Sequence, residues 1–197
     1  MPVKFELENP YRRAWILLRQ TYTLVLKCED RTFSEYKLTT EQYSVLMVIK
    51  HVEDPVKVTD VARWLDRSVN SVSMIIDRMV KAGLVRRRRD LPDRRAVRLT
   101  ITSKGEEAFV PATVAGWELI QEILSSLPDE DLLTLIRLLE MLRDKTYDYL
   151  GSGEVVEEVR RDGTENMARL MKQAAKYRSL STPEAKRQGG KKGKTMQ

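Results

Sequence analysis

Residues 83–101 (GLVRRRRDLPDRRAVRLTI) constrain the fold most, because they place seven arginines within nineteen residues. The second half of the segment alternates, so that Val97, Leu99 and Ile101 can bury one face of a strand while the other face stays in water. Residues 91–93 supply the turn that separates this strand from an earlier one. The segment predicts a two-stranded ribbon that holds cations in solvent. Because two strands alone are rarely stable, the ribbon must pack on neighbouring elements.

Two short helices are predicted immediately before the ribbon. The first spans residues 58–66 and has Thr59 placed to cap it. The second spans residues 69–82, with Ser68 as its N-terminal cap and Gly83 as a left-handed stop. The order helix, turn, helix and basic hairpin is that of a winged helix.

The second of these helices is strongly amphipathic. Its polar face begins with small hydrogen-bonding side chains, which can reach base edges in a major groove, and ends in longer cations, which can meet phosphate. The apolar stripe consists of Val69, Val72, Ile75, Ile76 and Met79, and the opposite face of Asn70, Ser73, Met74, Asp77, Arg78 and Lys81.

Residues 38–105 resemble the MarR family of winged-helix transcriptional regulators. The resemblance rests on LTTEQYSVL at 38–46, VTDVARWLD at 58–66, SVSMIIDRMVKAGLVRR at 71–87 and DRRAVRLTITSKG at 93–105, in the family's order. The loop between residues 50 and 58 and the tail after residue 151 depart from the family pattern. The resemblance implies a mainly α fold with a small β-hairpin wing, in which a winged helix-turn-helix is joined to a helical dimerisation region.

The remaining helices are predicted from periodicity and caps. Residues 11–33, 38–52, 102–124 and the segment opening at Pro128 have helical spacing, and Thr39 with Gln42 forms a capping box. The last helix has too many leucines for a lone surface helix, which fits a dimer, although the same leucines could fill one monomer's core. The expected organisation is an N-terminal dimerisation helix (1–37), a DNA-binding domain (38–105), C-terminal dimerisation helices (106–150), a helical extension (151–178) and a disordered basic tail (179–197).

The DNA contacts are assigned by side-chain chemistry and by the resemblance. Base edges are assigned to Asn70, Ser71 and Ser73, a thymine methyl to Met74, and phosphate to Arg78, Arg87 and Thr59; Ser68 and Arg94 complete the set. By resemblance, Asp93 and Arg95 match the family's wing tip, where the arginine enters the minor groove and the aspartate orients it. A simple ion pair that stabilises the wing is the alternative.

An effector site is implied by the resemblance, between the helical region and the winged helix. Its candidate lining is Trp15, Arg19, Tyr22, Tyr43, Met47, His51 and Trp117, although ordinary core packing also explains aromatic residues at helical spacing. Cys28 is expected to be an inert thiol rather than a redox switch, because Glu29 and Asp30 disfavour its thiolate.

Charge and composition narrow the function. Residues 1–150 carry 24 Lys and Arg against 23 Asp and Glu, so basic charge is concentrated in the ribbon and in residues 151–197. No signal-peptide core or span of about 20 apolar residues is present, and a cytoplasmic location is expected. With one histidine, one cysteine and no glycine-rich phosphate loop, no catalytic, cofactor or metal site is predicted.

The sequence therefore predicts a homodimeric transcriptional regulator. We expect a repressor that binds double-stranded DNA at an inverted repeat and responds to a small aromatic effector. The alternative is a winged helix that binds proteins and no longer reads DNA.

Overall fold

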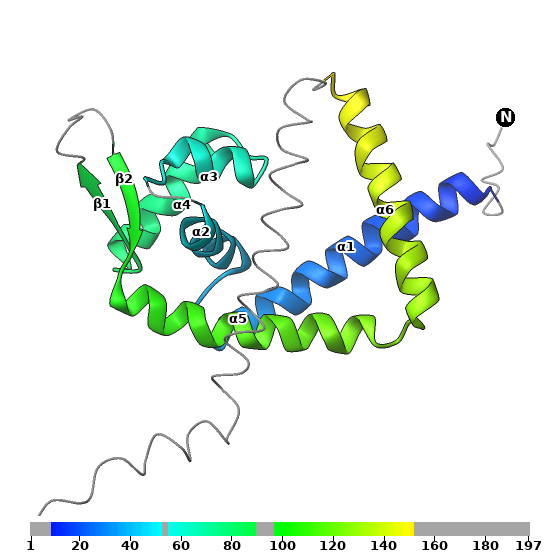
Figure 1. The fold of residues 1–197 in the computed structure, drawn as a ribbon, viewed down its shortest axis with the longest axis horizontal. Coiled ribbons are helices and arrows are strands. Elements are labelled where there is room, and N and C mark those ends of the chain that lie inside the picture. Colours follow the sequence, from blue (N-terminus) through cyan, green and yellow to red (C-terminus); the bar gives the residue numbers. More distant parts are fainter. Residues whose placement is uncertain (1–8, 53–54, 90–96, 152–197) are drawn as a thin grey trace, which may run out of the picture.

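The computed structural model describes residues 9–52, 55–89 and 97–151 (Figure 1). The predicted fold class is confirmed, since the described residues form helices and one two-stranded antiparallel sheet. The elements are α1 (Pro10–Ser34), α2 (Thr40–His51), α3 (Val58–Trp64), α4 (Val69–Lys81), β1 (Val85–Arg89), β2 (Val97–Ile101), α5 (Ser103–Leu124) and α6 (Asp129–Tyr149). Apart from residue 151, the predicted extension and basic tail lie outside the described residues.

The chain forms two halves joined by α5. In Figure 1, α2, α3, α4 and the β1–β2 hairpin lie together at one end, α1 and α6 lie at the other, and α5 runs beneath both. No helix in the described ranges is long and apolar enough to cross a membrane.

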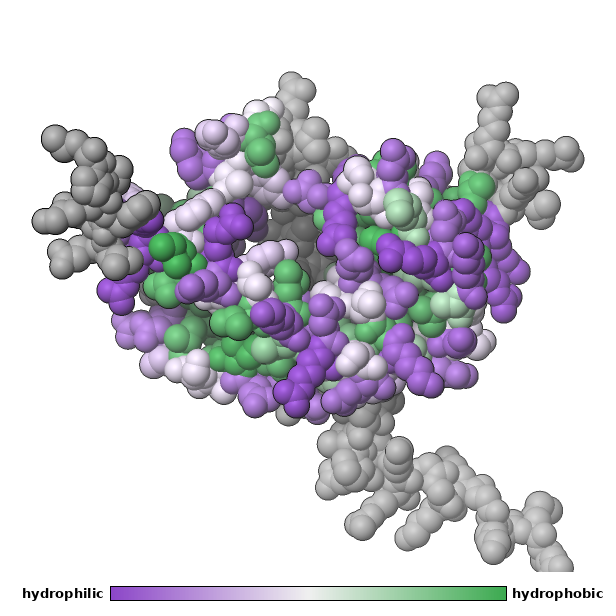
Figure 2. Space-filling view, turned by 180° about the vertical axis from the view of Figure 1, so that it is seen from behind, coloured by the Kyte–Doolittle hydropathy of each residue, from purple (hydrophilic) through white to green (hydrophobic). Residues whose placement is uncertain are grey.

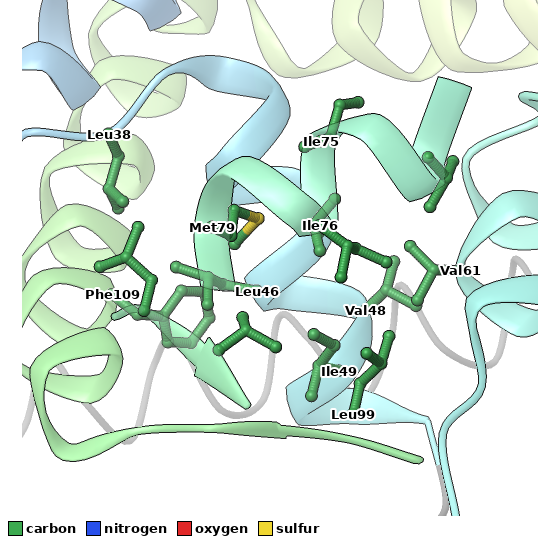
Figure 3. Packing of buried hydrophobic residues seen from close by; sticks show 14 of the residues in the cluster. Leu38, Leu46, Val48, Ile49, Val61, Ile75, Ile76, Met79, Leu99 and Phe109 are labelled. Carbon is green, nitrogen blue, oxygen red and sulfur yellow. The ribbon is translucent and has the colours of Figure 1, made fainter. Parts of the chain in front are cut away.

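The core lies in the winged-helix half. Almost fully buried side chains from four elements point toward one another there (Figure 3): Leu46 and Val48 of α2, Ile76 and Met79 of α4, Leu99 of β2 and Phe109 of α5. Burying such side chains removes apolar surface from water and is the main source of stability for this half. The hairpin is tied to the same core by the Leu99 amide, which donates to the carbonyl of Val56 at 2.8 Å.

Local caps fix where α2 and α5 begin. The predicted capping box is confirmed: Thr39 Oγ1 accepts from the Gln42 amide at 3.2 Å, and Gln42 Oε1 accepts from the Thr39 amide at 3.1 Å. At α5, Thr102 Oγ1 accepts from the Gly105 amide at 3.0 Å, so Thr102 is the cap.

The predicted start of α3 at residue 58 is confirmed, but its predicted cap was wrong. Thr59 lies inside the first turn of α3 and does not cap it; Lys57 occupies the N-cap position with an extended backbone. The Asp60 carboxylate accepts from the Lys57 amide at 2.8 Å, and this hydrogen bond stabilises the start of the helix. α3 also ends at Trp64 rather than at residue 66, because Asp66 adopts a left-handed backbone with φ of 49°.

The helical half leaves its apolar side chains uncovered. α6 has no buried residue, and it exposes Leu133, Leu139 and Leu142. On α1, Trp15 and Tyr22 are exposed as well. Hydrophobic side chains also reach the surface of this half in Figure 2. The leucines of α6 therefore do not fill the core of a single chain.

Candidate nucleic-acid interface

The helix α4 is built to hold one face in the core and the other in solvent. Ser68 Oγ accepts from the Ser71 amide at 3.2 Å, which confirms the predicted cap, and it donates to Ser71 Oγ at 2.9 Å. Gly83 ends the segment with φ of 74°, as predicted. The predicted apolar stripe is buried at Val72, Ile75, Ile76 and Met79.

Val69 differs from the rest of that stripe. It is 46% exposed, because it is the first residue of α4 and projects beyond the core. On the opposite face, Asn70, Ser71, Met74, Asp77, Arg78 and Lys81 are exposed and Ser73 is half-buried. The side chains assigned to base edges thus lie on the outer face of a helix whose inner face is fixed by packing.

The wing is joined to α4 by an ion pair that the sequence did not reveal. Arg87 of β1 lies 2.7 Å from Asp77 of α4, measured from Nη1 to Oδ1. Arg87 was assigned to phosphate, and the structure shows that its guanidinium already has a carboxylate partner. Arg78, the other arginine assigned to phosphate, is exposed and its Nε donates to the Met74 carbonyl at 3.3 Å.

The wing cations Arg86, Arg87 and Arg88 lie on β1, which pairs with β2 in an antiparallel hairpin. Val85 pairs with Ile101, Arg87 with Leu99 and Arg89 with Val97. Arg86, Arg87 and Arg88 are exposed. The predicted wing tip, Asp93, Arg94 and Arg95, lies outside the described residues. Thr59, which was assigned to phosphate, is exposed on α3.

The base of the wing is held by close contacts to α5. Thr102 Oγ1 donates to the Gly83 carbonyl at 2.6 Å, and Lys104 Nζ donates to the Ala82 carbonyl at 2.8 Å, next to the C-terminus of α4. Gly105 is required by sterics, because a Cβ there would lie 2.2 Å from the Leu84 carbonyl oxygen. These contacts fix the wing relative to the end of α4.

Three of the residues predicted to hold an effector, Tyr43, Met47 and His51, lie on α2. Tyr43 packs between Phe33 and Phe109, with ring centroids 4.0 and 5.5 Å away, and its hydroxyl donates to Thr113 Oγ1 at 3.4 Å. Burial raises the pKa of the Tyr43 hydroxyl, which keeps it neutral. His51 Nδ1 donates to the Met47 carbonyl at 2.5 Å.

The other predicted effector residues lie along the long helices. Trp15, Arg19 and Tyr22 are exposed on α1, and Trp117 is half-buried on α5. A cleft of about 710 Å³ lies between α1, α2 and the α3–α4 turn. Of the seven predicted effector residues, Tyr22 is the one in the lining of this cleft.

Comparison with known proteins identifies the family. A sequence model of the MarR family matches residues 36–96. The transcriptional regulator MgrA of Staphylococcus aureus is 31% identical over 110 residues, which cover 56% of this chain and 73% of MgrA. The chain belongs to the MarR family. It is therefore a transcriptional regulator with a DNA-binding winged helix, and not an enzyme.

Other regulators are similar to this chain over about two thirds to three quarters of its length. YpoP of Bacillus subtilis, an uncharacterised helix-turn-helix regulator, is 26% identical over 129 residues, 66% of this chain and 90% of YpoP. The organohalide-sensing RdhR regulator in its 2,4-dichlorophenol-bound form superposes with a TM-score of 0.66 at 24% identity, over 74% of this chain and 86% of that one. The S. aureus MepR–DNA complex superposes with a TM-score of 0.61 at 24% sequence identity, over 66% of this chain and 96% of that one. These two structures support the fold.

Proposed function

We propose that this MarR-family regulator is a homodimeric repressor that recognises an inverted-repeat operator and is released by a small molecule. The observation that carries the proposal is the outer face of α4, where Asn70, Ser71 and Met74 are exposed while the helix is locked into the core from behind. Short polar side chains can hydrogen-bond to base edges in a major groove, and the Met74 side chain can contact a thymine methyl there. The wing cations beside this face suit phosphate.

The proposed DNA contacts divide by role. Asn70, Ser71 and Ser73 are assigned to base edges, and Arg78 to phosphate. Asp93, Arg94 and Arg95 are assigned to the wing tip on sequence grounds. A protein-binding face would instead expose aromatic or apolar anchors, and the polar outer face of α4 favours DNA over that alternative.

Dimerisation is supported by the uncovered helices. Large hydrophobic side chains are exposed along α1, including Trp15 and Leu18, and along α6, including Leu139 and Leu142. Contiguous apolar surface of this kind marks an interface, and a two-fold axis through the helical half would place two α4 helices on one face. Half-sites about one helical turn apart follow from that symmetry. In this organisation residues 38–105 bind DNA, and residues 1–37 and 106–150 form the dimer.

The experiment is selection of bound sequences from random duplex DNA with the full chain, combined with sedimentation to measure its mass. A recovered inverted repeat and a dimer mass support the proposal. A bound sequence without two-fold symmetry contradicts the dimeric reader. Absence of any enriched sequence contradicts operator recognition and favours the protein-binding alternative.

A further inference from the structure

The first two turns of α4 expose two apolar side chains beside an amide. Val69, the first residue of α4, is 46% exposed, and Met74 is 63% exposed. Asn70 is exposed as well. Because a helix turns by about 100° per residue, Asn70 lies between Val69 and Met74 around the helix axis. This end of α4 therefore presents one amide with an apolar side chain on either side of it.

Neither apolar side chain is used by the core of the chain. Val72 and Ile76 of the same helix belong to the buried cluster, whereas Val69 and Met74 do not. An apolar side chain that stays in water contributes free energy only when a partner buries it. In a major groove, the apolar group that a base pair offers is the C5 methyl of thymine. The two exposed side chains therefore suit thymine.

The same end of α4 lacks the side chains that recognise guanine. Guanine is most often bound by Arg or Lys, which donates two hydrogen bonds to its O6 and N7 atoms. Residues 68–77 contain neither Lys nor Arg. The arginines on either side have partners in the protein: Arg67 forms an ion pair with Glu41, and Arg78 Nε donates to the Met74 carbonyl.

The carboxylate that could recognise cytosine also has a partner. Asp and Glu accept from the N4 amino group of cytosine. Asp77 is the acidic residue of α4, and its Oδ1 lies 2.7 Å from Nη1 of Arg87. The side-chain amide of Asn70, in contrast, has the donor and the acceptor that match N7 and N6 of adenine. The groups presented to solvent are thus those that suit an A·T pair.

We propose that the first two turns of α4 select A·T base pairs, with Asn70 bound to an adenine edge and with Val69 and Met74 in contact with thymine methyl groups. This inference rests on the proposed function, because it concerns the operator that α4 reads. It adds Val69, which the sequence placed in the apolar stripe, to the residues that determine specificity. Val69 and Met74 are about 7.5 Å apart along the helix axis, and base pairs stack roughly 3.4 Å apart, so the two methyl groups belong to different pairs.

The test removes single methyl groups from the DNA. Each thymine in one half-site of the operator recovered by selection is replaced in turn by deoxyuridine, which lacks the C5 methyl and keeps every hydrogen-bonding atom. Affinity for the full chain is measured by fluorescence anisotropy at one salt concentration. The wild type is expected to bind two of these duplexes about two- to fourfold more weakly than the operator, which is the change for one buried methyl group.

Each loss is expected to disappear in one protein variant. Val69→Ala should bind one of the two uracil duplexes as well as it binds the thymine operator, and Met74→Ala should do so for the other. Val80→Ala is the matched control, because Val80 is 37% exposed near the C-terminus of α4, and this variant should keep both losses. An operator with 7-deazaadenine, which lacks N7, should weaken binding of the wild type and not of Asn70→Ala.

The outcomes separate the inference from the proposed function. Methyl losses that vanish in the matched variants support the inference. An operator that shows no loss at any thymine, or losses that persist in Val69→Ala and Met74→Ala, overturns the inference and leaves the proposed function standing. A half-site whose selected pairs are G·C has the same consequence. Absence of any enriched sequence overturns the proposed function and the inference together.

Discussion

Arg87 is expected to support DNA binding mainly by neutralising Asp77. Asp77 is on the outer face of α4, where a free carboxylate would face DNA phosphates. The Arg87 guanidinium, 2.7 Å away, cancels that charge and holds the wing against the helix. Replacing Arg87 by Ala changes the net charge of this pair from zero to −1.

The size of the effect follows from exposure and distance. The side chains of Arg87 and Asp77 are 37% and 53% exposed, so the pair is screened by water and contributes less than about 1 kcal/mol to the free energy of unfolding. In the DNA complex, this single charge change acts on phosphate through water-like surroundings, at about 0.5–1 kcal/mol for charges roughly 7 Å apart. Arg87→Ala is therefore expected to cost about 0.5–1 kcal/mol of binding free energy, or a two- to fivefold increase in Kd.

The change in Kd is measured by fluorescence anisotropy with one operator duplex at a fixed salt concentration. The proteins compared are the wild type, Arg87→Ala, Asp77→Asn and the double variant. We expect Arg87→Ala to bind about two- to fivefold more weakly, the double variant to recover most of that loss, and Asp77→Asn to bind at least as tightly as the wild type. The melting temperatures should stay close together. If the double variant binds as weakly as Arg87→Ala, Arg87 contacts phosphate directly and the neutralisation argument is refuted.

Three further predictions concern stability. Gly105→Ala should destabilise the fold by about 1–3 kcal/mol in urea unfolding, because the new Cβ would lie 2.2 Å from the Leu84 carbonyl oxygen; an unchanged midpoint would contradict this packing. Thr39→Ala should lower the free energy of unfolding by about 0.5–2 kcal/mol through loss of the α2 cap, and a neutral result would show that the cap contributes nothing. The pKa of Glu29 is raised in the folded state, so its folding contribution is fully present below the ordinary pKa of 4.5 and is lost as pH rises through the folded pKa. Glu29→Gln should therefore raise the melting temperature at pH 7 and give no gain near pH 4, whereas a pH-independent difference would contradict the burial of its charge.

Local features of the fold could be predicted from the sequence. The caps at Ser68 and Thr39 involve partners three residues away, so the printed order of residues contains the whole interaction. Gly83 was predictable for the same reason, since a left-handed backbone is a property of one residue. The prediction that Thr59 caps α3 was wrong because threonine is a common cap residue wherever it stands near a helix start. In the structure, the hydrogen bond from the Lys57 amide to the Asp60 carboxylate stabilises the start of α3 instead.

Features that depend on tertiary packing could not be predicted. The Asp77–Arg87 pair requires the position of β1 relative to α4, which no local pattern encodes. Tyr43 has the spacing of a pocket aromatic and of a core aromatic alike, and only the packing of α1 and α5 around α2 places it between Phe33 and Phe109.

The cleft between α1, α2 and the α3–α4 turn could not be predicted for a related reason. Glu29 was noted in the sequence only as a neighbour of Cys28, which is half-buried. Its position in the lining of the cleft depends on how α1 packs beside the start of α2 and the α3–α4 turn, where Glu41 and Arg67 form an ion pair.

The most direct test of a sequence-reading α4 is the ratio of affinities for the selected operator and a scrambled duplex, measured at one salt concentration for the wild type, Asn70→Ala and the control Glu107→Ala. We expect Asn70→Ala to lose about 1–3 kcal/mol on the operator and nothing on the scrambled duplex, because base contacts give specificity and phosphate contacts do not. Glu107→Ala should match the wild type on both. Equal losses on the two duplexes, or no loss on either, would contradict the claim that the outer face of α4 reads DNA sequence.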